Sequence, residues 1–269
     1  MNLLGYLLFS IMGVILGLLG GGGSILTVPI LVYYFNVPAT LATGYSLFIV
    51  GVTSLVAALR YRKKRWLDYK IAIIFSVPSA IGVLFARLMV LPALPDTMRL
   101  FTIIVSKDQL ILYVFAALIM VISYFMFISK EPNSNHDGYT QFMSLYALFL
   151  IGLEGFVVGG VTGFVGAGGG FIIVPALTLL AKLPLKRAIA TSLLIIGAKS
   201  MIGFGGDIVS GVAYDLPFLG GVLGVTLIGT YLGVHLNQFL SPSKLRKGFA
   251  GFVLVMGVLM MAKEAQWVG

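Results

Sequence analysis

The chain contains no cysteine, which excludes thiol catalysis, cysteine-ligated metals and disulfide bonds. Charge is also scarce, because only 10% of the 269 residues are charged, whereas a soluble domain would have about one quarter. In contrast, 59% of the residues are hydrophobic and the mean hydropathy is +1.06. Apolar runs follow one another with hardly a polar gap. We therefore expect an all-α polytopic membrane protein.

Motifs of enzyme chemistry are also lacking. The sequence has no HExxH, no Walker A lysine, no Ser-His-Asp spacing and no acidic metal cluster, so we expect no enzyme activity, cofactor or metal. The net charge of +9 alone would suggest nucleic acid. However, the basic residues lie in short loops between apolar runs, as in cytoplasmic loops of membrane proteins. The expected partners are therefore membrane lipid and a small solute, without nucleic acid.

The glycine-rich stretch from Gly13 to Leu47 occurs twice. It reads GVILGLLGGGGSILTVPILVYYFNVPATLATGYSL, and from Gly159 the chain reads GGVTGFVGAGGGFIIVPALTLLAKLPLKRAIATSL. Adding 146 to each position aligns the two stretches without a gap, and both prolines and many glycines then coincide. We interpret this as a duplicated unit in which a glycine-rich break separates apolar helices.

The apolar pattern predicts five helical segments in each half of the chain. They are 2–19, 24–35, 39–60, 69–91 and 109–129, then 141–165, 170–182, 185–206, 216–239 and 244–262. The first transmembrane repeat would cover 1–129, a polar linker 130–139, and the second repeat 140–269. A short interfacial helix is expected around Met98–Val105.

The second segment of each half is too short to span a bilayer. Ile25–Phe35 and Phe171–Ala181 give about 16 Å of rise each, against a hydrocarbon core of about 30 Å. Each is therefore predicted to be a half-helix that begins near the middle of the membrane, at the glycine break.

Loop charges suggest that the two halves are inserted in opposite orientations. The loop after the third segment is basic, whereas the matching loop GGDIVSGVAYDLP contains two aspartates and no basic residue. Basic loops are retained in the cytoplasm, so the first loop would be cytoplasmic and the second external. We expect inverted repeats in an inner (cell) membrane, with both termini outside the cytoplasm. Such repeats with broken helices are common in secondary transporters.

The two glycine breaks predict a binding site for a small anion. Glycine lets a ligand approach the backbone, and a helix N-terminus offers free N–H groups and a positive dipole end. The candidate substrate-binding residues are Gly20, Gly21, Gly22, Gly23, Ser24, Ser46, Gly166, Gly168, Gly169, Gly170, Thr191, Ser192 and Lys199. The alternative role for the glycines is tight helix packing, which carries more weight for Gly13 and Gly17.

Three ionisable residues lie within apolar runs, where each should face a cavity or a partner. Lys199 lies seven residues after Ser192, on roughly the same helix face, and would either neutralise an anionic substrate or pair with Glu154 or Asp207. Glu154 would either carry a coupling proton or partner Lys199. Arg87 is expected to extend toward the outer interface.

The paired blocks GLLGGGGSILTVPILVYY and GFVGAGGGFIIVPALTLL, followed by ATGYSL and AIATSL, resemble the sulfite exporter TauE/SafE family, also called the 4-toluene sulfonate uptake permeases. The resemblance covers nearly the whole chain. It implies an inner-membrane carrier for small sulfur-containing anions, with the site carried by Gly20–Gly23, Ser24 and Gly166–Gly170. Lys199 stands where we would expect a neutral polar residue.

The leading hypothesis is a secondary transporter that moves sulfite, a sulfonate or a related organosulfur acid by alternating access around the paired breaks. The alternatives are an anion channel of the same architecture and a carrier for a small organic acid without sulfur. A proton, carried by Glu154, is the expected coupling ion.

Overall fold

The computed structural model describes residues 3–62, 65–100, 103–128, 145–166, 168–179, 181, 183–237, 239, 250–251 and 254–263. The longer helices are α1 (Leu3–Leu19), α3 (Ala39–Arg62), α4 (Tyr69–Phe85), α6 (Lys107–Ile128), α7 (Leu145–Val165), α8 (Gly170–Leu179), α9 (Leu185–Val209) and α10 (Leu216–Leu236). A last apolar helix covers Leu254–Lys263. The predicted linker lies outside the described residues, so the division into repeats at this point stays a prediction.

Four helical stretches are long and apolar enough to cross a membrane: Ala39–Arg62, Tyr69–Ala93, Lys186–Val209 and Leu216–Leu236. The second of these includes α4, a π-helical turn η3 (Ala86–Val90) and α5 (Leu91–Ala93). These spans agree with the predicted third, fourth, eighth and ninth segments. The expectation of a helical polytopic membrane protein is thus confirmed.

The second segment of each half is short, as predicted. In the first half it consists of a 3-10 turn η1 (Gly22–Leu26), α2 (Thr27–Pro29) and a π-helical turn η2 (Ile30–Tyr34). In the second half it is the 10-residue helix α8, which rises about 15 Å at 1.5 Å per residue. A bilayer core is about 30 Å thick, so α8 cannot cross one alone.

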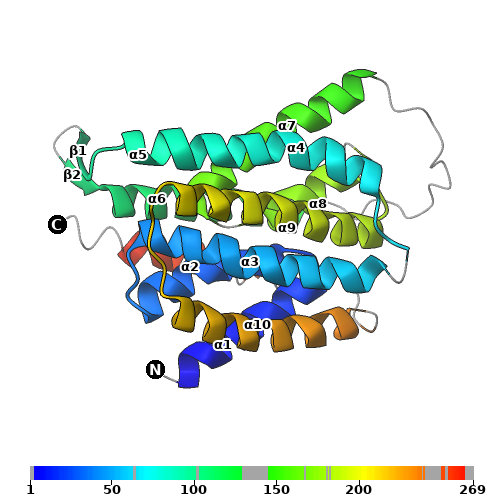
Figure 1. Ribbon diagram of the computed structural model, residues 1–269, viewed down its shortest axis with the longest axis horizontal. Helices are drawn as coiled ribbons and strands as arrows, with labels where there is room; N and C mark the ends of the chain where they lie inside the picture. The colour runs from blue at the N-terminus through cyan, green and yellow to red at the C-terminus, as the bar shows by residue number, and fades with distance from the viewer. Residues whose placement is uncertain are drawn as a thin grey trace.

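Glycines bring two helix pairs into backbone contact. A methyl group at Gly13 of α1 would touch the carbonyl oxygen of Thr226 in α10, and one at Gly159 of α7 would touch that of Ser79 in α4. Each half therefore packs its first long helix against the fourth segment of the other half, and the two pairs lie at opposite edges of the bundle (Figure 1). A methyl group at Gly17 would lie 2.7 Å from the backbone nitrogen of Val234. Gly13 and Gly17 thus allow close helix packing.

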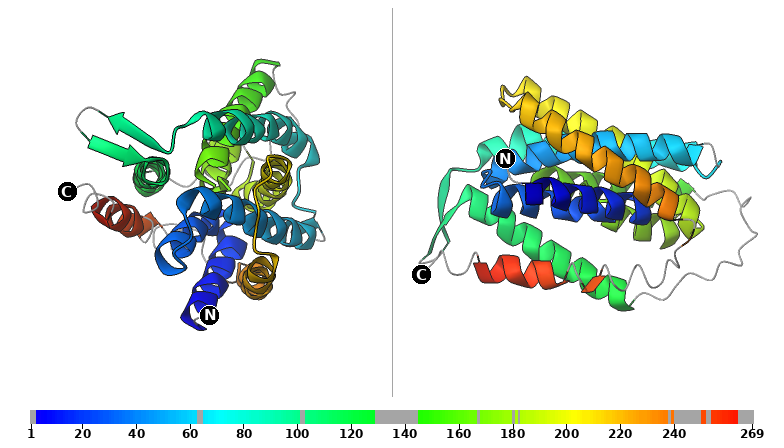
Figure 2. Two further views of the ribbon diagram at one scale, coloured as in Figure 1. Left: turned by 60° about the vertical axis from the view of Figure 1, so that its left-hand side comes forward. Right: turned by 90° about the horizontal axis from the view of Figure 1, so that it is seen from below.

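The region around Met98–Val105 is a β-hairpin, so the predicted interfacial helix is wrong. Strands β1 (Thr97–Leu100) and β2 (Ile103–Ser106) are antiparallel, with Thr97 opposite Ser106 and Leu100 opposite Ile103. The β-branched residues Thr97, Ile103, Ile104 and Val105 favour a strand, because branching at Cβ restricts side-chain rotamers in a helix. The hairpin projects away from the helices (Figure 2, left).

The fifth segments of the two halves also pack together. The Ser123 hydroxyl of α6 donates a hydrogen bond to the carbonyl oxygen of Ala250, over 2.7 Å. A methyl group at Gly257 in the last helix would lie 2.8 Å from Cγ of Met120. The two helices lie side by side along one face of the bundle (Figure 2, right).

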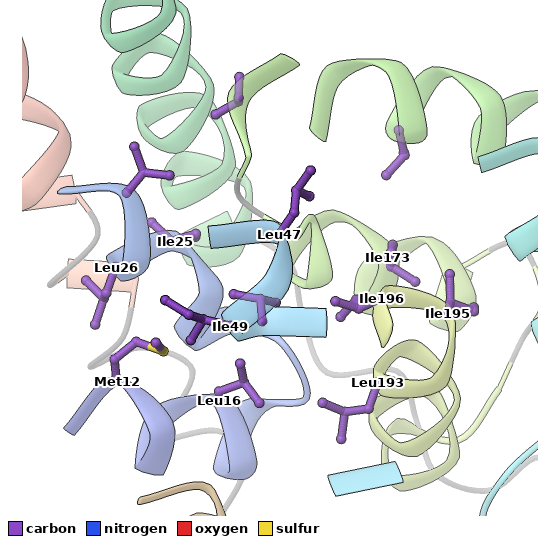
Figure 3. Close-up of a cluster of buried hydrophobic side chains, with 14 of the residues drawn as sticks. Met12, Leu16, Ile25, Leu26, Leu47, Ile49, Ile173, Leu193, Ile195 and Ile196 are labelled. Atoms are coloured by element: carbon purple, nitrogen blue, oxygen red, sulfur yellow. The ribbon is translucent and has the colours of Figure 1, made fainter. Parts of the chain in front are cut away.

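The centre of the molecule is an apolar cluster to which both halves contribute equivalent side chains (Figure 3). Leu47 and Ile49 come from α3, and Leu193 and Ile195 from α9, at positions 146 residues later. All four side chains are buried. The two copies of the duplicated sequence therefore form one shared core, and side chains of this core contact the glycine breaks.

Candidate functional site

The two glycine breaks touch each other, as the sequence predicted. A methyl group at Gly21 would lie 2.8 Å from Cα of Gly170, and one at Gly170 would lie 2.5 Å from Cα of Gly21. Neither position has room for a side chain. Five break residues also have positive φ angles between 65° and 100°, which L side chains adopt only at a cost; they are Gly20, Gly21, Gly166, Gly168 and Gly169.

Helix α9 holds the first break in place. The Ser192 hydroxyl donates to the carbonyl oxygens of Gly20 and Ile189, each over 2.8 Å. A methyl group at Gly20 would lie 2.9 Å from Cα of Ile189. At the second break, a methyl group at Gly166 would lie even closer to Cα of Thr43, which is the repeat counterpart of Ile189. Each break is therefore seated on the third long segment of the other half.

Hydroxyl groups near the breaks differ in how they are satisfied. The Ser24 hydroxyl donates to the carbonyl oxygen of Gly21, over 2.6 Å, and so stabilises the turn. Ser46 and Thr27 are fully buried, and their hydroxyl oxygens have no hydrogen-bond partner in the described part of the chain. Buried hydroxyls normally find partners, so these two are available to a polar ligand.

The starts of both short helical segments lie at this contact. Gly22 begins η1, directly after Gly21, and Gly170 begins α8. The first N–H groups of a helix have no acceptor within the helix, and this end carries a partial positive charge. Gly22, Gly23 and Gly170 are buried. The predicted convergence of two helix N-termini is therefore present.

Lys199 contributes a positive charge to the same place. Its side chain is only 1% exposed, and Nζ donates to Oγ1 of Thr162 in α7. A methyl group at Gly169 would lie 3.1 Å from this Nζ. The Thr162 bond uses one of the ammonium's three N–H donors. A buried charge without a counter-charge is costly, so an anion beside Gly169 would be stabilised.

Neither predicted carboxylate partner pairs with Lys199. Asp207 instead accepts from Nη1 of Arg87, over 3.2 Å. Among the described residues, neither Asp207 nor Glu154 forms any other salt bridge. The Arg87 side chain is 2% exposed, so the prediction that it extends to the interface is wrong; the Asp207 charge compensates its burial. Glu154 is partly buried in α7, and its Oε2 has no hydrogen-bond partner within the described ranges.

Thr191, the residue before Ser192 in α9, hydrogen-bonds at the start of α4. Its Oγ1 accepts from the backbone N–H of Asp68, over 3.0 Å. At the matching position of the first half, the Tyr45 hydroxyl accepts from the backbone N–H of Asp215, over 2.7 Å. Asp68 and Asp215 each cap a helix by accepting from a backbone N–H three residues on, over 3.0 Å. These paired contacts repeat across the two halves.

Sequence reasoning missed Thr162 and Tyr45. Thr162 lies 37 residues before Lys199 and Tyr45 lies 170 residues before Asp215, and no local pattern links either pair. The repeat alignment offered one usable signal, because Tyr45 and Thr191 occupy equivalent positions and both can accept a hydrogen bond.

A cavity of about 340 Å³ lies elsewhere, among α4, η3, α6 and α7. Its lining is apolar and includes Phe85, Val114 and Phe156. It therefore has none of the donors or charges that an anion needs, whereas the glycine breaks have both.

Comparison with known proteins agrees with this arrangement. A model of the family described as Sulfite exporter TauE/SafE matches residues 6–260. A probable membrane transporter protein of Methanocaldococcus jannaschii is 28% identical over 271 residues, covering 94% of each chain. The probable membrane transporter protein YunE of Bacillus subtilis is 32% identical over 253 residues, covering 87% of this chain and 89% of its own. No solved structure matches the chain.

The family match extends over both glycine breaks, over Lys199 and over all four membrane-spanning stretches. The relatives are named as probable membrane transporters and are matched over most of their length. The chain is a membrane transporter, and it belongs to the sulfite exporter TauE/SafE family.

Proposed function

We propose that the protein is a secondary transporter that moves a small sulfur-containing anion, such as sulfite or a sulfonate, across the cell's inner membrane. The observation that carries this proposal is the junction of the two glycine breaks, where two helix N-termini and the Lys199 ammonium group lie together. These groups provide N–H donors and positive charge but no described carboxylate. An oxyanion satisfies such a set, whereas a cation would be repelled.

Alternating access around this junction is the proposed mechanism. Both breaks are buried in this structure, and each is seated on the other half of the chain. Small movements of one half against the other would open the junction toward one end of the bundle or the other. Inverted repeats are supported by the loops, because the basic connection after α3 and the acidic connection after α9 lie at opposite ends (Figure 1). By the positive-inside rule, we expect the α3–α4 connection in the cytoplasm and the start of α1 outside.

The test is flux into liposomes that contain the purified protein. We expect saturable uptake of sulfite, sulfoacetate or thiosulfate, with less uptake of acetate as a sulfur-free acid. Uptake of acetate alone would favour the carrier for an organic acid without sulfur. A steady current that does not saturate would favour a channel. Intact protein that moves none of the sulfur anions would refute the proposed substrate class.

Lys199→Met tests the role of the ammonium group. A hydrogen bond to a charged group contributes about 1.5–3 kcal/mol, so the apparent affinity should fall about 10- to 100-fold. Thr53→Val is a matched control, because Thr53 holds the equivalent position in the first half and its hydroxyl bonds within its own helix to the carbonyl oxygen of Ile49. We expect the control to retain wild-type affinity. Equal affinities for Lys199→Met and wild type would exclude Lys199 from the site.

A further inference from the structure

A second cluster of polar side chains lies at the end of the bundle where α9 meets α10. Asp207 Oδ2 accepts from Nη1 of Arg87, over 3.2 Å, and from the Tyr214 hydroxyl, over 2.8 Å. Burial and the Asp207 charge raise the pKa of the Tyr214 phenol above its ordinary value, so Tyr214 remains a donor. A methyl group at Gly44 of α3 would lie 2.8 Å from the same carboxylate oxygen. Elements from both halves thus enclose this ion pair.

The guanidinium group of Arg87 is only partly satisfied. Nη1 pairs with Asp207, but Nε and Nη2 are buried and have no hydrogen-bond partner among the residues that the structure describes. The Nε–H group and one Nη2–H group point the same way, along one edge of the planar guanidinium, and this edge can bind two oxygens of a single oxyanion. Buried N–H donors seldom lack acceptors. Arg87 therefore has two unsatisfied N–H donors on one edge, the arrangement that binds an oxyanion side-on.

The position of Arg87 relative to Lys199 suggests what this oxyanion is. Asp207 follows Lys199 by eight residues on α9, which is about 12 Å along the helix axis. Phe204 lies between them, with its ring 4.8 Å from that of Phe48 and 5.0 Å from that of Tyr214. The ion pair and the central junction are therefore successive positions along one helix, with aromatic rings between them.

We propose that Arg87 is a second anion-binding position, in series with the Lys199 junction, that takes one oxyanion side-on through Nε and Nη2. The proposal rests on the proposed function, because the ligand is the anion that the protein transports. Asp207 keeps Nη1 and offsets part of the positive charge. An anion at Arg87 is thereby held more weakly than it would be by an isolated arginine, so it can move on to the junction.

Binding stoichiometry of the full-length protein in neutral detergent tests this, with sulfoacetate as the probe in equilibrium dialysis. Wild type should bind at two sites per chain. Lys199→Met and Arg87→Gln should each lose one site, and the double variant should lose both. No binding by wild type would refute the proposed function itself. A single site that Lys199→Met abolishes and Arg87→Gln leaves intact would refute only the second position.

Substitution of Asp207 should strengthen anion binding at Arg87, whereas substitution of Arg87 should weaken it. Asp207→Asn removes the competing carboxylate, so the affinity of Arg87 for sulfoacetate should rise about tenfold. Arg87→Lys should lower that affinity about tenfold, because lysine lacks the paired Nε–H and Nη2–H donors. A structural ion pair alone would make both variants unstable without changing affinity in opposite directions. If Arg87→Gln does not fold, Arg87→Gln/Asp207→Asn replaces the pair with neutral side chains of similar size and should also lose the second site. Retention of two sites there would overturn the proposal.

A lipid phosphate has the same oxyanion chemistry. Dialysis is therefore repeated with protein in phosphatidylcholine and in phosphatidylglycerol nanodiscs, both of which carry a phosphate, and compared with protein in neutral detergent. Retention of the second site in both kinds of nanodisc supports a transported anion. Loss of the second site in either kind, with its retention in detergent, would assign Arg87 to a lipid headgroup and overturn the proposal.

Discussion

Gly21→Ala should damage the junction of the two breaks more than its small size suggests. Gly21 has a φ angle of 100°, a conformation that costs an L residue about 1–3 kcal/mol. Its added methyl group would also lie 2.8 Å from Cα of Gly170 and would meet the Ile196 side chain. Overpacking of this kind costs about 1–3 kcal/mol. The two terms act on the same residue, so we expect the free energy of unfolding to fall by about 2–6 kcal/mol.

Thermal unfolding in detergent measures this change, with Gly224→Ala as the control. Gly224 lies within α10 and has no atom within 4 Å of its would-be methyl group. Alanine there should be neutral or should stabilise the helix by up to about 1 kcal/mol. A loss of 1 kcal/mol lowers Tm by about 2–4 °C in a chain of comparable size, so Gly21→Ala should melt at least about 4 °C below wild type. A Gly21→Ala protein that melts and transports like wild type would refute the contact between the breaks.

Further variants test other parts of the site. Ser192→Ala removes the hydrogen bond to Gly20, which contributes about 0.5–1.5 kcal/mol, and should reduce flux while the protein still folds. Gly169→Leu should reduce flux more strongly, since Gly169 has a φ angle of 75° and adjoins Thr162; wild-type flux in both would place the site elsewhere. Asp68→Ala and Asp215→Ala each remove a helix cap. Denaturant or thermal melts should show that each lowers the free energy of unfolding by about 0.5–2 kcal/mol. A large loss of stability in only one variant would show that the two halves do not use equivalent caps. In liposomes without a pH gradient, Glu154→Gln should exchange anions as wild type does. An imposed pH gradient should no longer increase anion flux in this variant; an increase that persists would exclude Glu154 as the proton carrier.

Helix positions were predictable because each apolar segment is bounded by local signals. The glycine runs, Pro38 and Pro184 mark the breaks and the starts of α3 and α9. The 146-residue repeat also predicted that the breaks would meet, since equivalent segments of a duplicated unit bury equivalent surfaces. Gly21 and Gly170 fulfil that prediction.

The partners of individual polar residues were not predictable in this way. Arg87 and Asp207 lie far apart in the sequence, and nothing in either segment marks the other. Arg87 also lies in a π-helical turn, η3, which shifts the direction of the side chains that follow it and has no sequence pattern of its own. Lys199 was recognised as unusual, but its bond to Thr162 depends on how α7 packs against α9.

The hairpin at Thr97–Ser106 was missed for a different reason. A short apolar run can form either a helix or a strand, and periodicity does not separate the two over so few residues. The repeat gave no guidance, because the region from Pro92 to Lys107 has no counterpart in the second half. Its β-branched residues were the usable signal.

Side-specific labelling of the junction tests the proposed transport site most directly. The chain has no cysteine, so Ser46→Cys places a single thiol at a fully buried hydroxyl that has no hydrogen-bond partner in the described structure. A small, anionic, membrane-impermeant thiosulfonate, which the positive junction does not repel, is applied to either side of oriented vesicles, with a quenching thiol in the opposite compartment. Sulfoacetate serves as the protecting anion because sulfite itself reacts with thiosulfonates. We predict modification from both sides, slowed by saturating sulfoacetate. Modification from one side only would contradict alternating access, and an unchanged rate in saturating sulfoacetate would contradict an anion site at the glycine breaks.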